Sequence, residues 1–527
     1  MSKNIGSVRN EGAVLVDNEQ VASGLKKSSI GFAGSVMALS GGAIVAQGLG
    51  IITAPIVTRL FAPEAFGLAA VFTSIVGMVG IVGCFTYELA IVLPKDDGDA
   101  ANVFALCFTF VVAITAFVVL LTGLFGSYFL GLFEGGAELE PYKWLIPSGI
   151  FLASLGIPLR YWNTRHKHFK RLAAVRIETA TIILAMRLGL GFLGFTTGLC
   201  LIVCGLFGLA AIPVILGLYL WPHDLPFILK AFAIKKMWRL AKRYKKFPLI
   251  HAWSGLLNTV SQEIPTILVV FYFGVATGGL YSLAKRLVSM PGNLVSAAAG
   301  QVFYQRAALA KTTTGDLAWL VENFADRLAA IGLLPMLIVV MTGPDLFRFV
   351  LGQRWADAGV YAAILAIWLF FMFVSGPMSH LYTVLERQGL ALFFNVAIIG
   401  SRIAALVVGG AVFRDVVWAL LLFSLVGVFF NVLQIVILTR LVKASIAVIM
   451  KSFILYFNYA VPTIIIIGCC RWLLHLSALY VLLASIVGCL PYVVLVLRHD
   501  KELRAAFYKV AKKIVLRIRS VKRAFYL

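Results

Sequence analysis

The chain has 527 residues, of which 61% are hydrophobic, and its mean hydropathy is +0.95. A soluble domain is roughly half apolar, so this composition excludes a water-soluble globular protein and indicates a protein that resides in a membrane. The formal charge of +23 does not indicate nucleic-acid binding, because no zinc-ligand spacing or RNA-binding signature accompanies it.

Apolar stretches recur along most of the chain. A helix needs about 20 apolar residues to cross a bilayer, and continuous rather than alternating apolar stretches favour helices over the strands of a barrel. The sequence therefore predicts an all-α, polytopic membrane protein with about 14 transmembrane helices. The predicted spans are 34–58, 67–93, 102–124, 142–160, 173–195, 198–220, 248–273, 276–304, 323–343, 358–378, 389–411, 415–439, 452–470 and 477–497.

Basic segments divide the predicted spans into groups. Residues 66–71 and 278–284 both carry Gly-Leu and small residues, a weak repeat that favours duplicated halves with a substrate held between them. The predicted divisions are a tail at 1–33, a six-helix lobe at 34–220, a basic loop at 221–247, a second six-helix lobe at 248–440, two further spans within 441–497 and a basic tail at 498–527.

Most of the 46 lysines and arginines lie in the tails and in alternate loops. Positive charge is retained on the cytoplasmic side of a membrane, so we expect both termini in the cytoplasm. The densest basic segments, Lys230–Lys246 and Arg498–Arg523, adjoin spans on that same side. Each cation there gains about 1 kcal/mol near anionic lipid. Topology and contact with anionic lipids therefore explain the charge.

Motifs of catalysis and cofactor binding are weak or absent in the sequence. Gly189–Gly194 satisfies G-x-G-x-x-G but lies within an apolar helix, which favours helix packing over dinucleotide binding. No Walker loop, serine nucleophile elbow or metal-ligand spacing occurs. The 7 cysteines all fall in predicted spans, where they serve as small hydrophobes. We therefore expect no catalytic residue, no cofactor and no metal.

Ionisable residues within the spans are the main functional signal. A lone charge at a helix centre costs roughly 2.5–3.5 kcal/mol on insertion scales, so such residues face a watery cavity or a partner. If the first hairpins of the two halves face each other, these groups converge on one cavity, where several arginines would attract a phosphate or pyrophosphate. The candidates for this cationic site are Arg59, Arg187, Lys285 and Arg286, with Gln47, Asn258, Gln262 and Asn293 as its uncharged polar groups.

Two carboxylates within predicted spans have a different candidate role. Glu88 and Glu263 could bind a proton or Na⁺ that resets a transport cycle. An alternative is that Glu263 pairs with Arg286 only to cancel both charges, and Arg402 could equally lie in a lateral helix contact.

Three stretches resemble a known family. They are Thr58–Gly67 after the first span, Tyr87–Pro94 closing the second, and Gly279–Leu287 with Pro291 in the eighth. Each resembles the polysaccharide-transporter branch of the multidrug/oligosaccharidyl-lipid/polysaccharide exporter superfamily, the Wzx-type O-antigen flippases. The resemblance implies two six-helix lobes in a V shape, with two helices appended.

The same resemblance implies an activity. The family moves undecaprenyl-pyrophosphate-linked oligosaccharide from the cytoplasmic to the periplasmic leaflet of the bacterial inner membrane by alternating access, for O-antigen or exopolysaccharide biosynthesis. On this reading, Arg286 and Arg59, helped by Lys285 and Arg187, contact the pyrophosphate. A polysaccharide polymerase and glycosyltransferases are the implied protein partners.

Three alternatives stay open at this level. One is a non-transporting scaffold for envelope assembly, which the charges within the spans disfavour. A multidrug exporter of the same superfamily would hold organic cations, which the basic residues within the spans disfavour. A membrane enzyme such as an O-antigen polymerase or ligase would need a large outer loop, and the predicted outer loops are short.

Overall fold

The computed structural model describes residues 41–132, 136–222, 224–313, 316–505 and 508, and those residues form helices and turns without any strand. This confirms the predicted all-α class. Eleven described helices are long and apolar enough to cross a membrane. The predicted count of about 14 stays a prediction, because two helices matching predicted spans fall outside the eleven and one long helix covers two spans. The tail at 1–33 and most of the tail at 498–527 lie outside the described residues.

The N-terminal lobe is an assembly of helices whose starts follow local capping rules. Pro63 occupies the first turn of α2, and Asp96 accepts a 3.1 Å hydrogen bond from the backbone N–H of Asp99 at the start of α3. The helices up to the end of the basic loop are Gly41–Leu60, α2 (Pro63–Gly80), η1 (Tyr87–Val92), α3 (Asp97–Gly131), α4 (Gly136–Leu139), η2 (Glu140–Tyr142), α5 (Leu145–Arg165), α6 (Phe169–Phe192), α7 (Gly198–Leu220), α8 (Asp224–Ala231) and α9 (Ile234–Arg243).

The C-terminal part begins with a long bent helix, α10. Its backbone leaves the helical region at Gly274, where φ is 84° and ψ is 168°, a conformation that favours glycine. This break falls between the predicted spans 248–273 and 276–304. The remaining elements are η3 (Phe247–His251), α10 (Ala252–Thr313), α11 (Leu317–Leu351), η4 (Gln353–Trp355), α12 (Ala356–Met378), α13 (Leu381–Val384), α14 (Gln388–Val408), η5 (Gly409–Phe413), α15 (Val416–Leu441), α16 (Ile446–Gly468), η6 (Cys469–Leu473) and α17 (Ala478–His499).

One predicted span is wrong in its extent. A continuous helix over 67–93 is replaced by α2 ending at Gly80, a turn, and the 3-10 helix η1. Phe85 and Thr86 take positive φ angles there, and the hydroxyl of Ser154 donates to the carbonyl of Gly80. Thr86 in turn donates to the carbonyl of Phe247 at 2.9 Å. The carbonyl of Gly80, where α2 ends, therefore has a partner on α5, and Thr86 joins the turn to Phe247.

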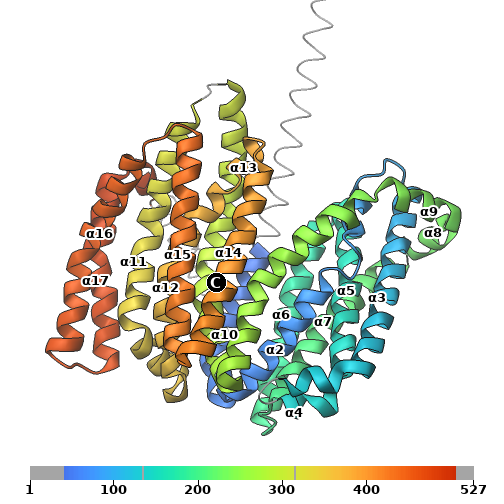
Figure 1. The fold of residues 1–527 in the computed structure, drawn as a ribbon, viewed down its shortest axis with the longest axis horizontal. Helices are drawn as coiled ribbons and strands as arrows, with labels where there is room; N and C mark the ends of the chain where they lie inside the picture. Colours follow the sequence, from blue (N-terminus) through green and yellow to red (C-terminus); the bar gives the residue numbers. More distant parts are fainter. Residues whose placement is uncertain (1–40, 133–135, 223, 314–315, 506–507, 509–527) are drawn as a thin grey trace, which may run out of the picture.

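The predicted basic loop at 221–247 is also structured. It contains α8 and α9, which are held against the N-terminal lobe by side-chain bonds to the backbone. Asn102 bonds both Ala231 and Ala233 at 2.9 Å, and the hydroxyl of Tyr87 donates to the carbonyl of Ala241 at 3.1 Å. Figure 1 places α8 and α9 at the outer edge of the N-terminal lobe, beside one end of α3.

The two lobes meet at one end of the molecule and diverge toward the other (Figure 1). The end where they meet is called the closed end here, and the opposite end, which carries α8, α9 and α13, the loop end. At the closed end Thr58 donates to the carbonyl of Leu351 at 3.1 Å, and Trp355 donates to the carbonyl of Thr58 at 2.9 Å. The ring of Phe66 meets Trp355 edge-on at 5.0 Å. These contacts seal the lobes together at the closed end.

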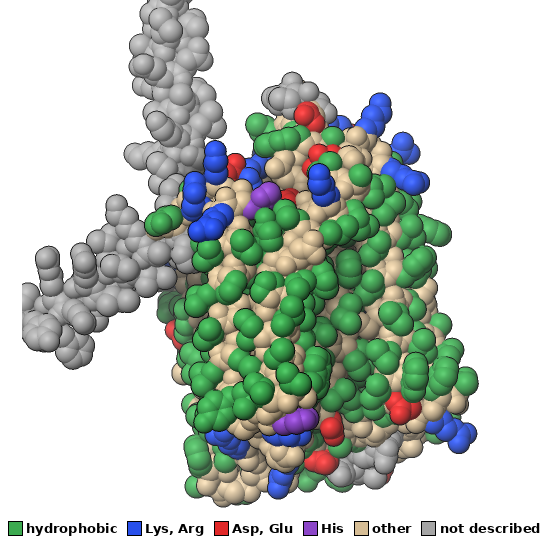
Figure 2. Space-filling model, turned by 90° about the vertical axis from the view of Figure 1, so that its left-hand side faces the viewer, with side chains coloured by type: hydrophobic (Ala, Val, Ile, Leu, Met, Phe, Trp, Pro, Cys, Tyr) green, Lys and Arg blue, Asp and Glu red, His purple; other side chains and the backbone are tan. Residues whose placement is uncertain are grey.

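The hairpin α16–α17 is attached to the C-terminal lobe through α11. Tyr456 donates to Asp326 at 3.0 Å, and Arg471 pairs with Asp345 at 3.1 Å. Figure 2 faces this side of the molecule and shows a broad hydrophobic belt, with charged side chains gathered above and below it. That distribution matches a bundle surrounded by lipid.

At the loop end of the N-terminal lobe, Arg165 joins α5 to η1 and to the start of α3. Its guanidinium donates to Asp97 at 2.7 and 2.9 Å and to the carbonyls of Ile91 and Pro94. We expect Arg165→Ala to lower the free energy of unfolding by about 1–3 kcal/mol, because the carbonyls and the carboxylate lose charge-assisted bonds. Thermal unfolding of the purified protein measures this. Arg239→Ala, whose side chain is exposed and lies 3.9 Å from Asp99, should change stability little, and equal losses in both variants would contradict the prediction.

Candidate functional site

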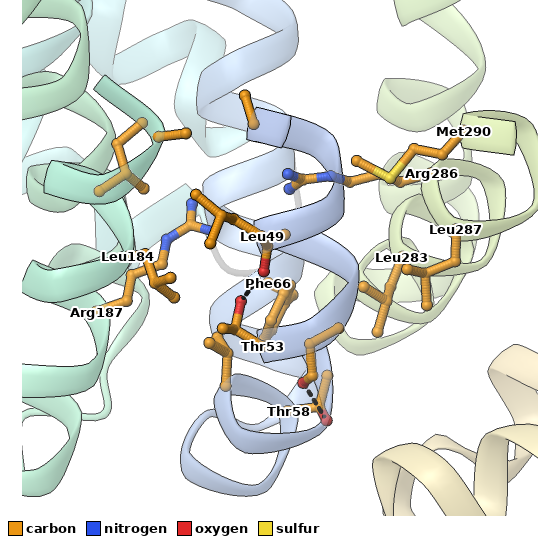
Figure 3. A pocket seen from close by; sticks show the side chains of 16 residues that line it. Leu49, Thr53, Thr58, Phe66, Leu184, Arg187, Leu283, Arg286, Leu287 and Met290 are labelled. Atoms are coloured by element: carbon orange, nitrogen blue, oxygen red, sulfur yellow. Dashed lines mark hydrogen bonds between the residues drawn. The ribbon is translucent and has the colours of Figure 1, made fainter. Parts of the chain in front are cut away.

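A cavity lies between the lobes, bordered by helix Gly41–Leu60, α6 and α10. Its volume is about 140 Å³ and its walls are mostly apolar, contributed by residues such as Leu49, Leu184 and Met290. Figure 3 shows Arg187 reaching in from α6 and Arg286 from α10, with helix Gly41–Leu60 between them. Both arginines line this cavity, one from each lobe, and helix Gly41–Leu60 contributes the wall between them.

A second hollow of about 270 Å³ adjoins the first. Both are lined by Phe66, Arg187, Leu283 and Arg286, so they form one continuous site. The second part adds polar and charged groups from α2 and α10, which are Thr73, Ser74, Glu263, Thr266, Ser282, Lys285 and Ser289. We call the two parts together the inter-lobe cavity.

In the described part of the chain, the cations of the inter-lobe cavity form no ion pair with the neighbouring carboxylate. Glu263 accepts a 2.7 Å hydrogen bond from Ser74 of α2, and Lys285 donates to the backbone carbonyl of Gln262. Among the described residues, no ion pair joins Glu263 to Arg286, so the arrangement seen here is not the simple charge cancellation considered as an alternative. The Nε atom of Arg187 is buried without a partner in the described part of the chain. Three cations thus share the cavity with one carboxylate.

The guanidinium of Arg286 is positioned for a ligand. Its Nη2 atom lies 3.9 Å from where a side chain on Gly50 would begin, so the glycine leaves the approach open. A guanidinium offers paired N–H donors that match a phosphate or carboxylate bidentately. With Arg187 opposite, the cavity is suited to an anionic ligand that carries several acceptor oxygens.

The structure brings together three of the four predicted cations. Arg187, Lys285 and Arg286 line the inter-lobe cavity, together with Glu263. Arg59 does not line either part of it: its side chain is exposed at the closed end, beside Gly352. It lies in the last turn of helix Gly41–Leu60, next to Thr58, whose hydrogen bonds join the lobes at the closed end.

The uncharged polar candidates lie around the cavity rather than on its walls. Asn258, Gln262 and Asn293 are exposed along α10, and none of them lines the two hollows. Gln47 lies on helix Gly41–Leu60, with its side-chain oxygen buried and without a partner among the described residues.

Glu88 lies in a different environment from the one predicted. It is 7% exposed, within η1, among the packed residues of the N-terminal lobe that include Cys84, Tyr87 and Cys107. One of its carboxyl oxygens has no partner in the described part of the chain. Glu88 and Glu263 are therefore in separate places, and a role for Glu88 in ion coupling stays a prediction.

Ser74 and Thr73 are cavity residues that sequence reasoning missed. Both lie on the face of α2 that also presents Phe66 and Ala70 to the cavity. A spacing of three or four residues marks one helix face, and this weak signal could have identified them. Arg402, by contrast, lies in a helix contact, stacked 3.9 Å from the Trp368 ring.

The amino-acid sequence is similar to those of two proteins of polysaccharide biosynthesis. The chain is 23% identical over 393 residues to the succinoglycan biosynthesis transport protein ExoT of Rhizobium meliloti, covering 72% of this chain and 74% of that protein. It is 22% identical over 380 residues to the lipopolysaccharide biosynthesis protein WzxC of Escherichia coli, covering 70% and 73%.

Two solved structures share the fold. The lipid II flippase MurJ in an inward closed conformation superposes with a TM-score of 0.62 at 13% identity, covering 89% of this chain and 99% of that one. An inward-facing multidrug resistance transporter of the MATE family gives 0.60 at 13% identity, covering 76% and 98%. Residues 56–360, more than half of the chain, match the model of a family described as polysaccharide biosynthesis proteins, and the chain belongs to that family.

Proposed function

We propose that the protein is a flippase that carries an undecaprenyl-pyrophosphate-linked oligosaccharide across the bacterial inner membrane by alternating access. One observation carries this proposal: Arg187 and Arg286, from opposite lobes, enter a single cavity between lobes that are sealed at one end. The family match and the polysaccharide-related names of two relatives support it.

The loop end is assigned to the cytoplasm and the closed end to the periplasm. The support is electrostatic, because α8, α9 and the segment after them carry the densest basic sequence of the described part of the chain, and such segments stay inside. Both termini are then cytoplasmic, and α9 lies where its cations meet anionic lipid headgroups. The arrangement described here is the inward-facing stage of the cycle.

In the proposed cycle the pyrophosphate enters from the cytoplasmic side and binds Arg187 and Arg286, with Lys285 adding positive charge nearby. The polyprenyl tail stays in lipid beside the gap between the lobes. Separation of the lobes at the closed end requires the bonds of Thr58 to Leu351 and Trp355 to break, and closure at the loop end completes the exchange of access. Charge stabilisation in a low-dielectric cavity is worth more than in water.

Coupling is assigned to Glu263 ahead of Glu88. The bond from Ser74 to Glu263 joins helices of the two lobes, so its formation depends on how the lobes are placed. Binding of a proton or Na⁺ at this carboxylate removes or compensates its charge and thereby changes that contact. The proposed transport cycle uses no organic cofactor. Glycosyltransferases act before it, to assemble the oligosaccharide, and a polysaccharide polymerase acts after it.

The multidrug-exporter alternative fits the cavity less well. An organic cation would meet Arg187, Lys285 and Arg286 against the single carboxylate of Glu263, which is repulsive overall. The MATE likeness is a likeness of fold alone.

Reconstitution tests the proposed function directly. Liposomes holding the purified protein and a fluorescent undecaprenyl-pyrophosphate oligosaccharide should show transfer between leaflets at least about tenfold faster than protein-free liposomes, since the cationic cavity lowers the barrier to moving the anionic headgroup. Proton and sodium gradients imposed separately identify the coupling ion. Transfer no faster than in protein-free liposomes, or uptake of organic cations instead, would contradict the proposal.

A further inference from the structure

The second half of α10 presents an exposed face that continues from the inter-lobe cavity. Asn293, Ala297, Gln301 and Tyr304 are exposed, and at 3.6 residues per turn they lie in a strip in line with Arg286. The side chain of Tyr304, the largest of the four, is 41% exposed. The strip from Arg286 to Tyr304 is about 27 Å long at 1.5 Å per residue.

One flank of the strip is packed against neighbouring residues. Gly300 lies against Pro377 and His380, and the Tyr304 and His380 rings lie 5.7 Å apart. Phe303 and Ala307 on the same flank are fully buried. Because Arg286 and Met290 line the inter-lobe cavity, their strip faces the space between the lobes, and it runs toward the loop end, where α13 lies (Figure 1).

The amides on this strip need a polar environment. Polar groups exposed to hydrocarbon within a membrane helix are costly, and among the described residues no group bonds the side chains of Asn293 or Gln301. An amide both donates and accepts hydrogen bonds, as a sugar hydroxyl does. Ala297 between them leaves the approach open, and the ring of Tyr304 offers an apolar face with a polar tip.

We propose that this strip of α10 binds the oligosaccharide of the lipid-linked substrate, with the sugar nearest the pyrophosphate at Arg286 and the distal sugars at Gln301 and Tyr304. The proposal rests on the proposed function and adds to it a binding site for sugar hydroxyls. The strip is long enough for several sugar units, and its amide side chains suit neutral sugars.

Binding of two probes to the purified protein tests this inference. One probe is undecaprenyl pyrophosphate, and the other is undecaprenyl pyrophosphate carrying a tetrasaccharide of neutral hexoses. We expect the wild type to bind the second more tightly, and the double variant Asn293→Ala/Gln301→Ala to lose about tenfold in affinity for the second alone, which is the loss expected from one or two hydrogen bonds. The matched control Gln388→Ala removes an exposed amide at the start of α14 and should change neither affinity.

The outcomes separate the two proposals. Unchanged affinity of the double variant for the tetrasaccharide probe, or equal losses for both probes, overturns the sugar-binding strip while leaving the pyrophosphate site intact. A wild-type protein that binds neither probe overturns the proposed function, and the strip with it.

Discussion

Replacing Arg286 with alanine is expected to reduce transfer of the lipid-linked oligosaccharide at least tenfold, with the protein folded and inserted. The side chain supplies paired donors to the pyrophosphate, and each charge-assisted hydrogen bond contributes about 1.5–3 kcal/mol. Arg286→Lys keeps the charge but not the planar fork, so its transfer rate should fall between those of the wild type and Arg286→Ala. Leaflet transfer in proteoliposomes measures all three proteins.

Two further variants show whether position or charge alone matters. Arg187→Ala removes the facing cation of the other lobe and should act in the same direction as Arg286→Ala. Arg348→Ala removes an exposed arginine of α11 that lines neither part of the cavity, and it should leave transfer unchanged. Normal transfer by Arg286→Ala would remove this residue from the mechanism, and equal losses in Arg348→Ala would reduce the effect to net charge.

The second large effect is expected at the closed end, where two glycines form reciprocal contacts. A side chain on Gly67 would begin 1.9 Å from the carbonyl oxygen of Val275, and one on Gly279 would begin 1.9 Å from that of Pro63. These are backbone atoms, which cannot move aside as a flexible side chain would. The double variant Gly67→Ala/Gly279→Ala should therefore force α2 and α10 apart.

The expected consequence is that the conformational equilibrium shifts away from the state in which the lobes are in contact at the closed end. Overpacking costs about 1–3 kcal/mol or more, and a penalty of about 3 kcal/mol changes the ratio of two conformations roughly a hundredfold. We expect the distance between spin labels at positions 59 and 354 to lengthen by several ångströms, together with loss of leaflet transfer. Both positions are exposed at the closed end.

The control for this variant lies on the same helix. Gly77→Ala adds the same methyl group to α2 where nothing lies within 4 Å, and both the label distance and the transfer rate should stay at wild-type values. An unchanged distance in the double variant would show that the closed end tolerates the added side chains and would refute this account of the seal.

The membrane location, the helical class and the approximate positions of most helices follow from the sequence alone. Each depends on the length and hydrophobicity of a continuous stretch, which are local properties. The assumption that the first hairpins of the two halves face each other also grouped Arg286, Lys285 and Glu263. These residues lie close together because α10 brings its two halves side by side after a bend at Gly274. The repeat at 66–71 and 278–284 likewise marked Gly67 and Gly279, which meet opposite helices at equivalent points.

Only the tertiary structure decided which face of each helix turns toward the cavity. Hydrophobic spans carry little periodic signal, because lipid and protein neighbours are both apolar. Sequence reasoning therefore could not separate Arg187, which faces Arg286, from Arg59, which lies at the closed end, or place Glu88 inside one lobe. That assignment depends on contacts such as Thr58 with Leu351, which lie 293 positions apart along the chain and form only when the two lobes pack together.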